Sequence, residues 1–225
     1  MLITFDVYTA LFDIEGSLTP LVREMLGNER DSLGFVRAWR SKQLEYALIS
    51  NSLEKERIPF ESITRRSLDD TLSRRHLDAD KTVRASLVYA WQNLKPWDEA
   101  AAVLETLKSR GYLLGLLSNG DTGLLQTLAK KLPPVIEHIF SSEQVGYYKP
   151  HPSIYKLPFQ ALHIKTDELL HVAGSPTDVL GAKAAGLRCA WSNRQSHPTL
   201  DTQYPADYEM TDLNGLLNIL YRQTY

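Results

Sequence analysis

The chain has 225 residues, of which 43% are hydrophobic and 23% are charged, values typical of a globular protein and unlike those of disordered, collagenous or coiled-coil chains. Its 25 basic and 27 acidic residues give a formal net charge of −2 without long runs of one sign, which argues against nucleic acid or a membrane surface as a partner. The length predicts one domain with a substantial insertion, or two small domains, and allows a hydrophobic core without metal or crosslinks.

Cysteine use and the apolar runs indicate the compartment. The single cysteine, Cys189, lies in an apolar run and is predicted to be a small buried residue, so no disulfide can form within one chain. The N-terminus enters a short apolar segment without a basic leader, and no apolar run approaches 18 residues. We therefore expect a cytoplasmic protein.

Short apolar runs alternate with helical patterns along most of the chain. Residues 2–7 predict a buried strand, and similar runs at 112–117, 169–173 and 187–191 predict three more. Helical spacing at 99–110 and 179–185 separates these strands, and each helix is followed by a glycine that suits a left-handed helix end. Such alternation predicts an α/β fold with a Rossmann-like, doubly wound parallel sheet, closed by a final helix around 213–220.

Residues 15–95 have a different pattern. Apolar residues recur there at helical spacing, and no strand pattern interrupts them. Glycine or proline at positions 16, 20, 59 and 96 is predicted to mark the helix boundaries. The sequence therefore predicts a core formed by residues 1–14 and 96–225, with an inserted α-helical cap at residues 15–95.

Polar side chains follow the predicted strands, at the edge where the carboxyl ends of parallel strands meet. Asp6 ends the first strand, Ser118 and Asn119 end the second, and residues 174–178 follow the third, while Lys149 lies in a loop that can reach the same edge. This set suggests a carboxylate that attacks an electrophilic centre and is then freed by water, with the lysine keeping the carboxylate ionised. Simpler roles remain open, since Asp6 can merely cap a turn and residues 118–120 can be a bare turn.

The order of these residues resembles the four motifs of the haloacid dehalogenase superfamily. The matching segments are Asp6 after Ile3-Thr4-Phe5, Ser118 after Leu116-Leu117, Lys149-Pro150, and Asp178 followed by Gly181-Ala182 and Ala185-Gly186. Within that superfamily, residues 39–46 resemble the cap helix of the L-2-haloacid dehalogenases, the type II group. The resemblance implies hydrolytic dehalogenation of short 2-haloalkanoic acids through an aspartyl ester, a small carboxylate as substrate, no metal or organic cofactor, and a homodimer.

The resemblance also implies roles for individual residues. The implied catalytic residues are Asp6 as nucleophile, Arg40 facing the leaving halide, Lys149 paired with the nucleophile, and Asp178 near the hydrolytic water. The implied substrate contacts are Tyr8, Ser118 at the substrate carboxylate, Asn119 at the halide, Tyr155 and Ser175. A plainer interpretation of Arg40 remains open, in which it is a solvated arginine paired with Glu45 or Asp31.

Two motifs depart from the family pattern. Asp-x-Tyr-Gly-Thr-Leu is Asp6-Val7-Tyr8-Thr9-Ala10-Leu11 here, so we expect the threonine hydroxyl beside the nucleophile to be missing at Ala10. In the fourth motif, Ala173 replaces a serine, Ser175 an asparagine and Thr177 an aromatic residue that faces the halide. Halide recognition and water activation are the steps that these replacements affect.

Two other functions remain open. A phosphatase of the same superfamily needs Mg²⁺ held by several carboxylates and a proton donor two residues after the nucleophile, but Tyr8 and Gly174 occupy the relevant positions. A carboxylate-binding protein of this fold with little turnover would fit the missing groups. The histidines lack metal-ligand spacing, so His151 and His171 are predicted to be a loop and a strand residue, and no G-x-G-x-x-G pattern supports a nucleotide cofactor.

Overall fold

The computed structural model describes residues 1–27, 31–53 and 55–221, and the chain divides into two compact units. The α/β unit consists of Met1–Phe12 and Pro96–Tyr225, and the helical unit consists of Asp13–Lys95. The sequence placed the first boundary at 14/15, whereas the structure divides at 12/13; both place the second at 95/96. The chain crosses between the units at the short paired strands β2 (Phe12–Asp13) and β3 (Lys95–Pro96).

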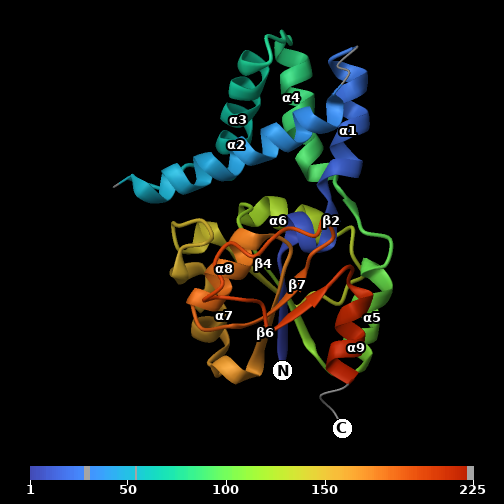
Figure 1. Cartoon of the computed structure of the whole chain (residues 1–225), viewed down its shortest axis with the longest axis vertical. Helices are drawn as coiled ribbons and strands as arrows, with labels where there is room; N and C mark the ends of the chain where they lie inside the picture. The colour runs from blue at the N-terminus through green and yellow to red at the C-terminus, as the bar shows by residue number, and fades with distance from the viewer. Residues whose placement is uncertain (28–30, 54, 222–225) are drawn as a thin grey trace. The chain divides into compact units, whose positions relative to one another are not determined.

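A six-stranded parallel sheet forms the centre of the α/β unit, with the strand order β5-β4-β1-β6-β7-β8 (Figure 1). Its strands are β1 (Leu2–Phe5), β4 (Leu113–Ser118), β5 (His138–Ser141), β6 (Leu169–Ala173), β7 (Arg188–Ser192) and β8 (Tyr208–Met210). The order reverses direction next to β1, which is the position where doubly wound sheets place their ligand sites. The predicted Rossmann-like α/β class is therefore confirmed.

Helices cover both faces of this sheet. The helices of the unit are α5 (Ala100–Ser109), α6 (Thr122–Ala129), α7 (Pro152–Leu162), α8 (Pro176–Ala184) and α9 (Asn214–Tyr221), with single turns η3 (Ser142–Gln144) and η4 (Thr166–Glu168). Figure 1 shows α7 and α8 on one side of the strands and α5 and α9 on the other. Side chains of β6 and β7, including Ala173, Cys189 and Trp191, form an apolar cluster with α7 and α8.

The N-terminal strand is shorter than predicted. β1 ends at Phe5, and Val7–Leu11 form a single π-helical turn, η1, in place of the continuous strand expected through residue 7. Asp6 is the residue between them and caps η1 with its side chain. Wide turns of this kind recur at functional sites because they redirect side chains locally.

The helical unit contains α1 (Ile14–Met25), α2 (Ser32–Ser52), α3 (Phe60–Arg74), α4 (Lys81–Ala90) and the short turn η2 (Trp91–Asn93). Its interior is aromatic: Trp39 meets Trp91 edge to face at 5.4 Å, and Phe35 and Phe60 pack against them. Pro20 lies inside α1, so it does not mark the helix boundary that the sequence predicted there. Among the residues that the structure describes, no helix combines the length and apolar character needed to cross a membrane.

Candidate active site

Asp6 is held in a fixed orientation at the carboxyl end of β1. Its backbone N–H donates to Val172 O at 2.9 Å, and its Oδ2 accepts from the backbone N (3.2 Å) and the Oγ1 hydroxyl (2.9 Å) of Thr9. Because position 10 is alanine, the sequence predicted no hydroxyl beside the nucleophile. That expectation is wrong, because the Thr9 hydroxyl, one position earlier, donates to Asp6. The π-helical turn makes this possible by turning residue 9 back toward Asp6.

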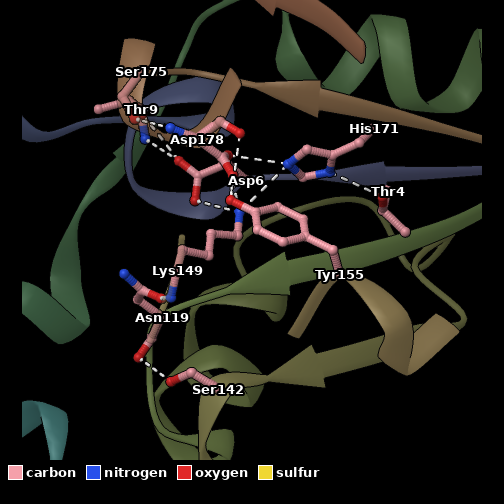
Figure 2. Close-up of polar contacts among 10 residues, drawn as sticks. All are labelled: Thr4, Asp6, Thr9, Asn119, Ser142, Lys149, Tyr155, His171, Ser175 and Asp178. Atoms are coloured by element: carbon pink, nitrogen blue, oxygen red, sulfur yellow. Dashed lines mark hydrogen bonds and ion pairs between the residues drawn. The ribbon is translucent and has the colours of Figure 1, made fainter. Parts of the chain in front are cut away.

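Lys149 lies between two buried carboxylates (Figure 2). Its Nζ is 3.4 Å from Asp6 Oδ1 and 2.9 Å from Asp178 Oδ2, and the three residues are between 4% and 6% exposed. Two carboxylates and one ammonium group in a nearly dry site interact more strongly than they would in water. The structure thus brings together three of the four residues predicted to be catalytic.

Asp178 receives hydrogen bonds on both carboxylate oxygens. The Tyr155 hydroxyl donates to Oδ1 at 2.8 Å, while Lys149 Nζ and His171 Nε2 (3.0 Å) lie at Oδ2. Burial on its own raises the pKa of Asp178, but the charge of Lys149, the electrostatic interaction with His171 and the hydrogen bonds from both outweigh it and hold the pKa well below its usual value. Burial and the neighbouring Asp178 charge raise the pKa of Tyr155. Asp178 is accordingly ionised at neutral pH, and Tyr155 remains a donor.

Ser175 begins the helix that carries Asp178. Its Oγ accepts from Asp178 N at 3.3 Å as the N-cap of α8, with Pro176 in the first helical position. The predicted contact of Ser175 with substrate remains untested. Its observed hydrogen bond fixes the start of α8, and with it the position of Asp178.

His171 belongs to this site, although the sequence suggested only a strand residue. It lies fully buried in β6, with Nε2 at 3.0 Å from Asp178 Oδ2 and 3.4 Å from Lys149 Nζ, and Nδ1 at 3.0 Å from Thr4 Oγ1. The available signal was a polar residue in each of two apolar strands, Thr4 and His171, which the sheet register places side by side.

Ser118 is the last residue of β4, and Asn119 follows it, next to the lysine loop. Asn119 Oδ1 accepts from Lys149 N at 2.7 Å and Asn119 O accepts from Ser142 Oγ at 2.9 Å, so the amide is fixed in orientation (Figure 2). Ser118 Oγ is fully buried and has no hydrogen-bond partner among the described residues. A buried hydroxyl without a partner is costly, which marks this position as one where a polar ligand group would be stabilised.

Two glycines leave space for site residues. A Cβ at Gly120 would lie 2.4 Å from the hydroxyl of Tyr8, which is fully buried in η1, and a Cβ at Gly174 would lie 2.3 Å from both Thr9 Oγ1 and Ala10 N. A side chain at position 174 is therefore incompatible with the observed path of η1. Among the described residues, no group of three or more His, Cys, Asp or Glu side chains could hold a metal ion.

Arg40, the fourth predicted catalytic residue, belongs to the helical unit. Its guanidinium donates to Gln43 Oε1 and lies 5.8 Å from the centre of the Trp91 ring. Gln43 is fixed in turn by its bond to Thr64 Oγ1 at 2.6 Å. These contacts orient the arginine on α2, and the pairing with Glu45 or Asp31 stays a prediction.

A doubly wound sheet with a buried aspartate and lysine at its carboxyl edge defines an α/β hydrolase that works through a carboxylate. The haloacid dehalogenase-like hydrolase family matches residues 7–186. Haloacetate dehalogenase H-2 of Moraxella sp. (strain B) is 30% identical over 97% of this chain and 96% of its own length, and (S)-2-haloacid dehalogenase 4A of Burkholderia cepacia is 30% identical over 96% and 93%.

Solved structures agree with these relatives. L-2-haloacid dehalogenase from Xanthobacter autotrophicus, with chloropropionic acid covalently bound, superposes with a TM-score of 0.86 at 27% identity, over 98% of this chain and 99% of that one. The chain belongs to the haloacid dehalogenase-like hydrolases, and among them it is similar to the L-2-haloacid dehalogenases.

Proposed function

We propose that this enzyme hydrolyses the carbon–halogen bond of short 2-haloalkanoic acids through an ester on Asp6. The observation that carries the proposal is the support of the Asp6 carboxylate, with Thr9 on Oδ2 and Lys149 at Oδ1 in a buried setting. A carboxylate fixed in this way and kept ionised by an ammonium group is prepared to act as a nucleophile. The covalently bound acid in the similar Xanthobacter structure supports the same chemistry here.

In the first half of the reaction, an oxygen of Asp6 attacks C2 of the substrate. A carbon–oxygen bond forms, the carbon–halogen bond breaks, and halide leaves with the electron pair. We assign Arg40 and the amide of Asn119 to the leaving halide, because a cation and a fixed donor stabilise developing negative charge. The Ser118 hydroxyl, which has no hydrogen-bond partner among the described residues, is assigned to the substrate carboxylate, and the buried Tyr8 is assigned to the same substrate.

In the second half, water attacks the carbonyl carbon of the Asp6 ester. The carbonyl carbon–alkoxy oxygen bond breaks, the 2-hydroxy acid leaves, and Asp6 retains one oxygen atom from water. Asp178 is the carboxylate that orients this water, with Lys149 beside the ester. Because the Tyr155 hydroxyl is already bonded to Asp178, we assign Tyr155 to orienting that carboxylate rather than to contacting substrate.

We propose that no metal takes part. The superfamily's phosphatases place a magnesium-binding aspartate where this chain has Gly174, and a side chain there would overlap η1. Metal-independent attack at carbon therefore fits the site better than phosphoryl transfer.

The decisive experiment measures halide release from chloro-, bromo- and fluoroacetate and from 2-halopropionates, with and without EDTA, beside a generic phosphate ester. A single turnover with excess enzyme in H₂¹⁸O should place ¹⁸O in Asp6 before it appears in the product. Asp6→Asn should abolish halide release, because an amide is not an anionic nucleophile, while the exposed Asp167→Asn should not change it.

Three results would contradict the proposal. Absence of halide from every acid would leave a carboxylate-binding protein as the better account. Strict dependence on Mg²⁺ with phosphate release would favour a phosphatase. Label that appears in the product without appearing in Asp6 would mean that water attacks the substrate directly.

The cellular setting is also part of the proposal. We propose a homodimer that acts in the cytoplasm on a small carboxylate, as the likeness to L-2-haloacid dehalogenases implies. Burial raises the pKa of the Cys189 thiol and makes it unreactive, which supports a chain that needs no oxidising compartment. Sedimentation velocity tests the dimer, and fractionation of the source cells tests the compartment.

A further inference from the structure

His171 joins the site to a second strand of the sheet (Figure 2). Thr4 in β1 is the Cα partner of His171 in β6, and the two side chains meet at 3.0 Å between Oγ1 and Nδ1. On its other side, the imidazole places Nε2 at 3.0 Å from Asp178 Oδ2. A chain of contacts therefore runs from Thr4 through His171 to the carboxylate that orients water.

The surroundings of the ring determine where its proton lies. An unprotonated Nε2 would direct its lone pair at the Asp178 carboxylate across 3.0 Å, and this repulsion outweighs a longer contact of 3.4 Å with the Lys149 ammonium. We therefore infer that Nε2 carries a hydrogen and donates it to Oδ2. In the neutral ring, Nδ1 then accepts a hydrogen bond, and the Thr4 hydroxyl is a donor at the correct distance. Thr4 thus selects the tautomer that serves Asp178.

The groups packed around His171 separate it from substrate and solvent. Thr4 faces it from β1, Lys149 from the loop before α7, Tyr155 from α7 with its ring edge-on at 6.0 Å, Asp178 from α8, and Cys189 is its register neighbour in β7. The imidazole itself is completely buried. It therefore acts through Asp178 rather than on the reacting atoms.

The contact between His171 and Asp178 determines which acceptor directions of the Asp178 carboxylate remain available to water. Lys149 and His171 occupy both acceptor directions of Oδ2, while Tyr155 occupies one of the two at Oδ1. The remaining direction of Oδ1 can accept a hydrogen from water. Without His171, the carboxylate can rotate about its Cβ–Cγ bond and leave that orientation.

We propose that His171, held in one tautomer by Thr4, is a positioning residue that fixes Asp178 for hydrolysis of the Asp6 ester. This inference rests on the proposed function and assigns the pair to its second half. Formation of the ester depends on Asp6, whose own side-chain contacts come from Thr9 and Lys149 and not from His171.

The test separates the two halves of the reaction with variants of similar size. His171→Phe keeps an aromatic ring without a donor, His171→Gln places an amide donor near the position of Nε2, and Thr4→Val removes only the hydroxyl. Cys189→Ala, in register with His171 but outside the polar network, controls for disturbance of the core. Urea unfolding first establishes that each variant is folded.

We expect the burst of halide in His171→Phe to keep nearly its wild-type rate, while ester hydrolysis slows roughly ten- to hundredfold, the usual effect of losing a hydrogen bond to a charged group. Mass spectrometry should then show esterified Asp6 accumulating. KM should fall together with kcat, because the ester builds up. His171→Gln should recover much of the hydrolysis rate, Thr4→Val should slow it severalfold, and Cys189→Ala should match the wild type.

Two kinetic results would overturn the proposal: unchanged hydrolysis in His171→Phe, or an equal loss in both halves that His171→Gln does not restore. ¹⁵N NMR of the histidine rings, with His171 assigned by its loss in His171→Gln, tests the tautomer without turnover. A hydrogen on Nδ1 and none on Nε2 would also overturn it. Wild-type enzyme that releases no halide would instead refute the proposed function, and the role in ester hydrolysis with it, while the NMR result would still decide the tautomer.

Discussion

The two units differ in how deeply their paired charged side chains are buried. The α/β unit buries Asp6, Lys149 and Asp178 together, whereas ion pairs in the described part of the helical unit keep partly exposed side chains, as Arg74 and Asp70 do. Exposed pairs contribute roughly 0–1 kcal/mol, while buried charges lose solvation that their partners only partly restore. The comparison indicates that the buried cluster persists because of its chemistry, and that the helical unit obtains its stability from aromatic packing.

The largest effect should follow from removing the cation of the buried cluster. Lys149→Met leaves two carboxylates in a nearly dry site, so the free energy of unfolding should fall by about 3–5 kcal/mol. Lys183→Met, at a pair on the surface with Asp207, should lose less than about 1 kcal/mol. Urea unfolding at neutral pH measures both, and equal losses would erase the distinction between buried and exposed pairs.

Arg40 is the residue of the helical unit to which we give a chemical role. Arg40→Ala should lower kcat by on the order of 10²–10³, by analogy with the loss of a donor that stabilises an oxyanion. Arg37→Ala is the matched control, because Arg37 lies on the same helix and pairs with Glu15 at the surface. If the two variants had the same kcat, Arg40 would be an ordinary surface arginine.

Acidification should lower the free energy of unfolding more through the buried carboxyl group of Asp178 than through a partly exposed one. Although burial raises the pKa of Asp178, its partners lower it further, so the unfolded chain takes up this proton at a higher pH than the folded chain. Stability from Asp178 is therefore present above about pH 4 and is lost progressively as the pH falls below that value.

The free energy of unfolding measured between pH 7 and pH 3 tests this sign. Asp178→Asn should remove most of the loss. The hydrogen bond from Arg74 also lowers the pKa of Asp70, but Asp70 is only partly buried and solvent screens its ion pair with Arg74. Asp70→Asn should therefore change the loss little. A wild-type loss on acidification that persists in Asp178→Asn would contradict the assignment.

The smallest effect concerns a neutral member of the buried cluster. Thr9→Val removes the hydroxyl on Asp6 Oδ2 and should slow halide release about tenfold, the value of one hydrogen bond to a charged acceptor. The pair Thr9→Gly with Ala10→Thr, which restores the family order, should recover part of that rate. If Ala10→Thr alone, with Thr9 kept, released halide faster than the wild type, Thr9 would not already supply the hydroxyl.

The sequence predicted the central strands because their apolar runs are buried on both faces. It missed β5 and β8, since His138–Ser141 and Tyr208–Met210 are short and contain polar residues at or near the sheet edges. The order of Asp6, Lys149 and Asp178 was sufficient to predict that they would meet. The domain boundaries come from the change in apolar pattern and the residue roles come from the resemblance; both remain proposals.

Other parts of the site depend on three-dimensional detail that residue order does not contain. Thr9 reaches Asp6 because a helical turn capped by Asp6 replaces the predicted end of the strand. His171 meets Thr4 only through the register between β1 and β6, which no local pattern specifies. A prediction that compares residues with a family pattern position by position therefore counts the hydroxyl at Ala10 as lost.

The close approach at Gly174 restricts how this sequence can change over evolutionary time. Because a Cβ at position 174 would overlap Thr9 and the backbone of Ala10, no replacement there is accommodated while η1 keeps its present course. A lineage that acquired a ligand-bearing side chain at this position would first need a different nucleophile loop, so the order of the two changes matters. The two segments are separated by more than half the chain, yet they constitute a single epistatic unit.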